Sequence, residues 1–173
     1  MLLTFVSMKK YLLLLFILVS SVHVFAQEKK VDSLPYQKYP TMPAFKVLLT
    51  DSTRMMNTFD IPKGRPTILM YFSPDCDHCE KTVQSIIGHM EDLKQARILL
   101  FSPMSMAAIR RFAEKLNLGE YKNILIGQNY DNTFSGFYSP NYVPFIVIYD
   151  RDKKLVRAFE GGAKIEALIE AAR

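Results

Sequence analysis

The feature that most constrains the fold is an apolar segment followed at once by two cysteines and an amphipathic segment. Thr67–Phe72 is almost continuously apolar, which is typical of a strand buried on both faces. Cys76 and Cys79 come next, and they are the only cysteines of the 173-residue chain. Apolar residues then recur at helical spacing and predict an amphipathic helix that starts close to Cys76; they are Val83, Ile86, Ile87, Met90 and Leu93.

From Ala44 onward the chain alternates between strand and helix patterns. Ala44–Thr50 and Arg54–Phe59 are expected to form a hairpin across the turn at Asp51–Ser52. The remaining expected elements are strands over Arg97–Phe101, Asn123–Ile126, Phe145–Tyr149 and Leu155–Phe159, and helices from Ser105 to near Gly119, from Asp131 to Tyr138 and over Lys164–Ala172. This order predicts one α/β domain over residues 44–173, with a mixed central sheet, helices on both faces and an N-terminal hairpin.

Residues 1–26 have the pattern of a secretory signal peptide. Two lysines precede an apolar run, and small residues lead to an expected cleavage before Gln27. Translation starts at either Met1 or Met8, because Met-Lys-Lys directly precedes the run. We therefore expect an exported protein of the periplasm or cell envelope.

The alternative is a membrane anchor formed by the same segment without cleavage. Tyr11–Phe25 is shorter than the ~20 residues that a spanning helix needs, and His23 interrupts it. If cleavage occurs, we expect no stable membrane insertion. Residues 27–43 are polar and contain three prolines, and they predict an extended leader to the domain.

The positive charge of the chain does not indicate a nucleic-acid partner. The formal net charge is +5, but the basic residues occur in scattered pairs such as Arg110–Arg111 and Lys153–Lys154. A nucleic-acid site shows a basic stripe with aromatic partners or a recognisable reading element. The sequence has neither pattern, so we interpret these charges as solvated surface and expect no nucleic acid.

The position of the cysteine pair at a helix start has a chemical consequence. Unpaired backbone N–H groups and the positive end of the helix dipole stabilise an anion there. They favour a thiolate at Cys76, and the thiolate is the nucleophile in disulfide exchange. Cys79, one turn further on, is close enough to form a disulfide with Cys76 or to resolve a mixed disulfide.

Two other interpretations of the pair are weaker. A structural disulfide across so short a loop restricts the unfolded chain little. A zinc site needs two further ligands, and after the expected cleavage only His78 and His89 remain, with His78 between the cysteines. We therefore expect redox chemistry, no metal and no cofactor.

Several segments of the chain resemble a known family. Thr67-Ile-Leu-Met-Tyr-Phe-Ser-Pro-Asp-Cys-Asp-His-Cys79 resembles the strand-to-motif segment of thioredoxin-fold proteins. Val143-Pro144, before the expected strand, resembles their cis-proline loop. The leader, the early hairpin and the turn at 150–154 resemble the exported TlpA/ResA-like thiol–disulfide oxidoreductases, over roughly Pro43–Arg173.

This resemblance implies a thioredoxin-like fold, together with protein thiol or disulfide substrates and a redox partner protein. It implies that Pro144 is cis and faces the cysteines, and that the Val143 backbone pairs with an incoming substrate chain. Aromatic residues before Pro144 can add an apolar rim for a substrate protein, although we expect half or more of them to pack on the sheet; they are Tyr130, Phe134, Phe137, Tyr138 and Tyr142.

The chain departs from this family at positions that help move the proton of the resolving cysteine. Met70 stands where cytosolic thioredoxins carry a buried Asp, and Thr82 stands where several ResA-like members carry a carboxylate. Asp75 replaces the usual Trp before the first cysteine. The sequence therefore assigns no proton acceptor to Cys79.

Charges next to the pair are expected to tune its redox potential in opposite directions. A protonated His78 stabilises a Cys76 thiolate and makes the disulfide more oxidising. The carboxylates of Asp75, Asp77 and Glu80 oppose this effect. The residues leave the redox direction open, and the family resemblance favours a reductant.

Two alternative functions belong to other classes. Peroxiredoxins share the fold and place Thr or Ser three residues before the reactive cysteine, where this chain has Ser73. They also place Pro seven residues before it, where this chain has Leu69. The other alternative is a non-catalytic thioredoxin-fold binding module, whose disulfide would be inert and very stable.

Overall fold

The computed structural model describes Leu34–Arg173, and the expected signal peptide at 1–26 lies outside the described residues. The described residues form a seven-stranded sheet in the order β2-β1-β5-β4-β3-β6-β7. β4 is parallel to β3 and β5, and all other neighbours are antiparallel, so the mixed sheet and the N-terminal hairpin are confirmed. The strands are β1 (Lys46–Leu49), β2 (Met55–Asn57), β3 (Thr67–Tyr71), β4 (Arg97–Ser102), β5 (Ile124–Gln128), β6 (Phe145–Tyr149) and β7 (Leu155–Glu160).

Helices follow β3, β4, β5 and β7, as the sequence predicts. The Ser105 Oγ caps α5 by accepting from the Ala108 N–H at 3.3 Å. At α6 the N-cap residue is Asn132, whose side chain makes no cap bond, and the Asp131 carboxylate just before it accepts from the Thr133 N–H at 3.1 Å. The helices are α3 (Asp77–Gly88), α4 (Met90–Leu93), α5 (Met106–Lys115), α6 (Thr133–Tyr138) and α7 (Ile165–Ala171), with 3-10 turns η2 (Thr58–Asp60) and η3 (Leu118–Glu120).

The sequence predicts one helix through Leu93, but the structure divides it at His89. The His89 backbone has φ −118° and ψ 29°, outside helical values, and its Nδ1 lies 3.0 Å from the Ser85 carbonyl oxygen. Gly88 ends α3, and glycine has a low helix propensity. Leu93 of α4 nevertheless packs in the same cluster as Ile86 of α3.

The expected extended leader is also corrected in its described part. α2 (Pro35–Lys38) forms one helical turn within residues 27–43. Proline suits the first helical position, because the N–H that it lacks would have no partner there. The turn is held by packing, since Tyr36 contacts the rings of Tyr138 and Phe145.

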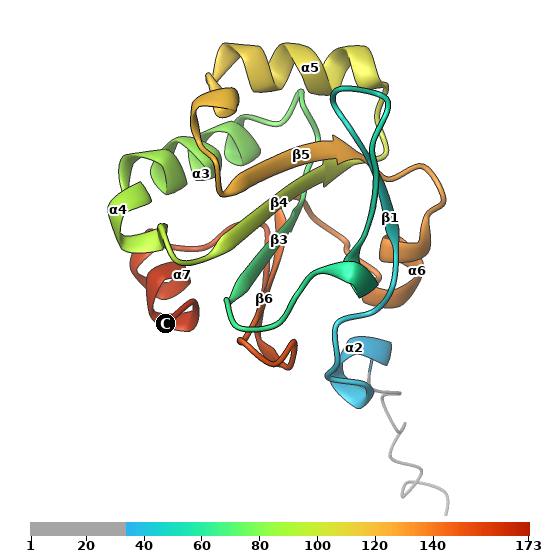
Figure 1. The fold of residues 1–173 in the computed structure, drawn as a ribbon, viewed down its shortest axis with the longest axis vertical. Helices are drawn as coiled ribbons and strands as arrows, with labels where there is room; N and C mark the ends of the chain where they lie inside the picture. The colour runs from blue at the N-terminus through green and yellow to red at the C-terminus, as the bar shows by residue number, and fades with distance from the viewer. Residues whose placement is uncertain (1–33) are drawn as a thin grey trace, which may run out of the picture. The chain divides into compact units, whose positions relative to one another are not determined.

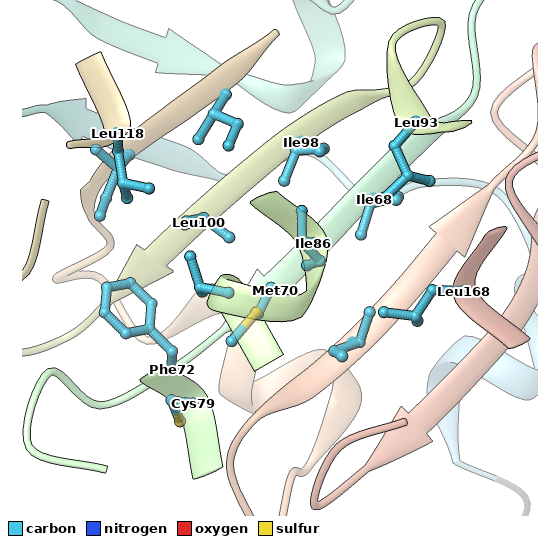
Figure 2. Packing of buried hydrophobic residues seen from close by; sticks show 14 of the residues in the cluster. Ile68, Met70, Phe72, Cys79, Ile86, Leu93, Ile98, Leu100, Leu118 and Leu168 are labelled. Atoms are coloured by element: carbon cyan, nitrogen blue, oxygen red, sulfur yellow. The ribbon is translucent and has the colours of Figure 1, made fainter. Parts of the chain in front are cut away.

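Alternate residues of the central strands face opposite layers of helices. Ile68 and Met70 of β3 pack on the face covered by α3, α5 and α7, in one cluster with Leu168, and Figure 2 shows them close to Ile86. Leu69 packs on the other face, in an aromatic-rich cluster with residues of α6. Helices therefore cover both faces, as predicted (Figure 1).

The carboxyl ends of the three parallel strands lie at one edge of the sheet. Tyr71 of β3 pairs with Phe101 of β4, which pairs with Gly127 of β5. The cysteine segment follows β3 and therefore begins at this edge. Gly127 permits the close approach of β1, because a Cβ there would lie 2.7 Å from Val47 Cγ1 and closer still to the Leu48 carbonyl.

Candidate active site

Cys76 lies at the N-terminal cap of α3, where the chain has just left β3. Its backbone is extended (φ −100°, ψ 111°), and its sulfur accepts a hydrogen bond from the Cys79 N–H at 3.2 Å. Cys76 is half-buried and is therefore less shielded from solvent than a core residue. The cap bond and the helix dipole both favour a negative charge on this sulfur.

Cys79 lies one turn further along α3 and packs into the core. It is fully buried, in the cluster that contains Met70 and Phe72 (Figure 2). Burial raises the pKa of the Cys79 thiol far above its usual value, and its hydrogen bond to the Cys76 sulfur raises it further. Both cysteines are free thiols. The pair thus combines a half-buried cysteine with a fully buried one whose thiol holds its proton.

The loop before β6 brings Val143 to the cysteine pair from 67 residues away. The Cys76 thiol lies 3.8 Å from the Val143 carbonyl oxygen, within range of a weak S–H donor. The Val143–Pro144 peptide bond is cis, as the resemblance implies, and Pro144 is buried. The structure therefore gathers Cys76, Cys79, Val143 and Pro144 at one edge of the sheet.

The carboxylate of Glu80 has a partner that the sequence analysis missed. The Lys115 ammonium, at the end of α5, donates to Glu80 Oε2 at 2.7 Å, and the Gln84 amide donates to Glu80 Oε1 at 3.3 Å. Lys115 lies 35 residues along the chain from Glu80, so no spacing pattern links the two. One of the three acids expected to oppose His78 is thus neutralised within the protein.

The other charged neighbours of the pair are exposed to solvent. Asp75, Asp77 and His78 are all exposed, and no ion pair within the described part of the chain includes any of them. Water screens charges in such positions, so each acts on the Cys76 sulfur only weakly. Asp75, Asp77 and His78, which are expected to tune the redox potential, thus lie next to the cysteines in sequence and form no ion pair among the described residues.

Met70 and Thr82, where the sequence differs from the thioredoxin-fold proteins that it resembles, offer no base for the Cys79 proton. Met70 is fully buried in the same cluster as Cys79. Thr82 uses its hydroxyl to donate to the His78 carbonyl at 2.8 Å. The proton acceptor for Cys79 is therefore neither of these side chains.

The expected apolar rim divides into packed and exposed aromatic residues. Phe134 and Tyr138 are fully buried and Phe137 is half-buried, so these three pack on the sheet. Tyr130 is 57% exposed and Tyr142 is 70% exposed. Tyr142 directly precedes Val143, which makes it the aromatic residue of this set nearest in sequence to the cysteine-facing loop.

No group of three or more His, Cys, Asp or Glu side chains among the described residues is placed to hold a metal ion. None of the helices formed by these residues is long and apolar enough to cross a membrane.

Comparison with solved structures identifies the architecture. A putative thioredoxin from Neisseria meningitidis matches with a TM-score of 0.62 at 16% identity, over 80% of this chain and 87% of that chain. A secreted Mycobacterium tuberculosis disulfide oxidoreductase homologous to E. coli DsbE matches with a TM-score of 0.61 at 16% identity, over 74% of this chain and 93% of that chain. The chain has a thioredoxin-like fold.

The thioredoxin-like fold is shared with proteins of more than one activity. A peroxiredoxin-like protein from Aquifex aeolicus matches with a TM-score of 0.63 at 14% identity, over 76% of this chain and 83% of that chain. No family model and no curated protein sequence matches the chain. The fold is thus established by architecture, and the activity has to be argued from the site.

Proposed function

We propose that this protein is an exported thiol–disulfide oxidoreductase that exchanges disulfides with protein substrates through Cys76 and Cys79. The observation that carries the proposal is the unequal exposure of the two sulfurs: Cys76 is half-buried at the start of α3, and Cys79 is fully buried behind it. A nucleophile needs access and a stabilised thiolate, and a resolving thiol is best shielded from other reactants. The thioredoxin-like fold supports the same function.

In the reducing direction the reaction takes two steps. The Cys76 thiolate attacks one sulfur of a substrate disulfide, so a Cys76–substrate bond forms, the substrate S–S bond breaks, and the released substrate sulfur takes a proton. The Cys79 thiol then loses its proton and attacks the Cys76 sulfur. A Cys76–Cys79 bond forms and the second substrate thiol leaves, so two electrons pass from the protein to the substrate.

We propose the reducing direction from the resemblance to the TlpA/ResA-like oxidoreductases. The charges beside Cys76 do not decide it, because the carboxylates of Asp75 and Asp77 disfavour a thiolate whereas His78 and the start of α3 favour one. Export is proposed from the signal-peptide pattern of residues 1–26, and a redox partner protein would return electrons to the pair.

Single-cysteine variants test the proposal. Cys79→Ala, mixed with a disulfide-bonded protein such as insulin, should accumulate a mixed disulfide at Cys76 that nothing resolves, visible on a non-reducing gel. Cys76→Ala should form far less adduct, because its remaining thiol is buried. Equal trapping by both variants would contradict the assignment of the nucleophile, and failure of the wild-type dithiol to reduce insulin would contradict the function.

A thiol-dependent peroxidase is the second candidate. The likeness to a peroxiredoxin-like protein and the position of Ser73 before Cys76 favour it, and Leu69 in place of a proline argues against it. Consumption of hydrogen peroxide with a dithiol, without insulin reduction, would establish the peroxidase instead. A protein that neither reduces insulin nor consumes hydrogen peroxide would instead fit a non-catalytic binding module with a thioredoxin-like fold.

A further inference from the structure

The carboxylate of Glu160 binds the backbone of the loop that carries Val143. Glu160 is the last residue of β7 and pairs with Phe145, the first residue of β6. From there its Oε1 accepts hydrogen bonds from two successive backbone groups, the Asn141 N–H and the Tyr142 N–H, the latter at 3.1 Å. Two amides aimed at one carboxylate oxygen form a charge-assisted contact, which is stronger than a bond between neutral groups.

The residues bound by Glu160 directly precede the part of the loop that faces the cysteines. Tyr142 is followed by Val143, whose carbonyl oxygen lies 3.8 Å from the Cys76 sulfur. Among the described residues, Glu160 is the only side chain with a hydrogen bond to the Asn141 or Tyr142 backbone. Glu160 therefore holds the backbone immediately before Val143.

Two glycines after Glu160 bring the chain against the back of the same loop. Gly161 has φ 75° and Gly162 has φ 112°, values that side-chain-bearing residues rarely adopt. A Cβ at Gly162 would lie 3.8 Å from Pro144 Cγ and 3.7 Å from Thr82 Oγ1 on α3. The segment after β7 thus packs between the proline of the loop and the helix that carries the cysteines.

We propose that Glu160 is a positioning residue of this site. It fixes the Asn141 and Tyr142 amides so that the Val143 main chain stands beside Cys76 in the orientation that an extended, disulfide-containing substrate peptide needs for backbone pairing. The inference rests on the proposed function for its catalytic consequence. A protein substrate depends on this alignment, and a small aromatic disulfide, which has no peptide backbone, does not.

Kinetics with two substrates test the role of Glu160. In Glu160→Ala, kcat/KM for reduction of insulin should fall at least about tenfold, the scale expected when a bound substrate is misaligned with the reacting group. The rate with 5,5′-dithiobis(2-nitrobenzoate) should stay within about twofold of wild type, because the Cys76 sulfur itself is unchanged. Glu160→Gln keeps an acceptor oxygen at the same reach, so it should restore most of the insulin activity. Glu166→Ala, on α7, removes an equal charge away from the loop and is the matched control.

Amide hydrogen exchange gives a readout that does not depend on activity. The Asn141 and Tyr142 amides should exchange about tenfold faster in Glu160→Ala than in wild type, and at the wild-type rate in Glu166→Ala. Amide exchange and insulin kinetics that both stay at wild-type values in Glu160→Ala would overturn the inference. An equal loss of rate with insulin and with 5,5′-dithiobis(2-nitrobenzoate), or a Glu160→Gln variant as impaired as Glu160→Ala, would overturn it too. If wild type does not reduce insulin, the proposed function fails, whereas the exchange result still decides whether Glu160 holds the loop.

Discussion

Removing Cys76 should leave a thiol that ionises only at strongly alkaline pH. In Cys76→Ala the remaining cysteine, Cys79, keeps the burial that is the largest cause of its raised pKa. Its exposed fraction is 0%, so both its ionisation and its access to reagents are suppressed. Cys76, at the helix start, is less buried, so reagents reach it more readily. The two thiols should therefore differ in the pH dependence of their alkylation as well as in its rate.

The size of the effect follows from the thiolate fraction. An unperturbed cysteine with a pKa of about 8.5 is roughly 3% ionised at pH 7 and almost fully ionised at pH 10, so its alkylation rate rises about 30-fold and then levels off. A thiol whose pKa lies well above this range gains about tenfold per pH unit. Between pH 7 and pH 10 the rate for Cys79 should rise close to 1,000-fold without levelling.

The assay is iodoacetamide labelling of the reduced Cys76→Ala protein, followed by mass spectrometry at a series of pH values. The same variant unfolded in guanidinium is the control, and its rate should level off near pH 9.5 as for a free thiol. Cys79→Ala gives the rate of Cys76 in the folded protein. A plateau below about pH 9.5 in folded Cys76→Ala, or equal rates for the two variants at pH 7, would refute the reasoning.

Three further predictions concern redox tuning and stability. His78→Ala should shift the reduction potential to more negative values by about 10–30 mV, because water screens the charge of this exposed side chain; a shift below about 10 mV in a glutathione titration would show that His78 does not set the potential. Gly127→Ala should lower the free energy of unfolding by about 1–3 kcal/mol because its Cβ would collide with β1, and Gly119→Ala, which meets nothing within 4 Å, is the control in thermal unfolding. Burial raises the pKa of the hydrogen-bonded phenols of Tyr138 and Tyr149, the latter to about 12. Above pH 10 the unfolded chain therefore binds fewer protons than the folded protein. The free energy of unfolding should fall by up to about 2.7 kcal/mol per pH unit because of this pair. Tyr149→Phe should roughly halve that slope in alkaline denaturation.

The elements near the cysteines were predictable because their signals are local. The apolar run over Thr67–Phe72 predicts a strand from six consecutive residues. The helical periodicity after Cys76 and the cap at Ser105 likewise depend on residues that are close in sequence. In the leader, where an extended chain was expected, tertiary packing outweighed local pattern. The one-turn helix Pro35–Lys38 is too short to be stable by itself, and contacts of Tyr36 with the aromatic cluster hold it.

The sequence by itself determined the order of the strands and helices and the place of the cysteine pair at a helix start. Only the tertiary structure decided which distant side chains meet there. Lys115 reaches Glu80 because α3 and α5 cover the same face of the sheet. Glu160 reaches the loop before Val143 because β7 pairs with β6 in one particular register. Periodicity specifies which side of an element is buried, but the register and the packing of whole elements set the distances between residues far apart in the chain.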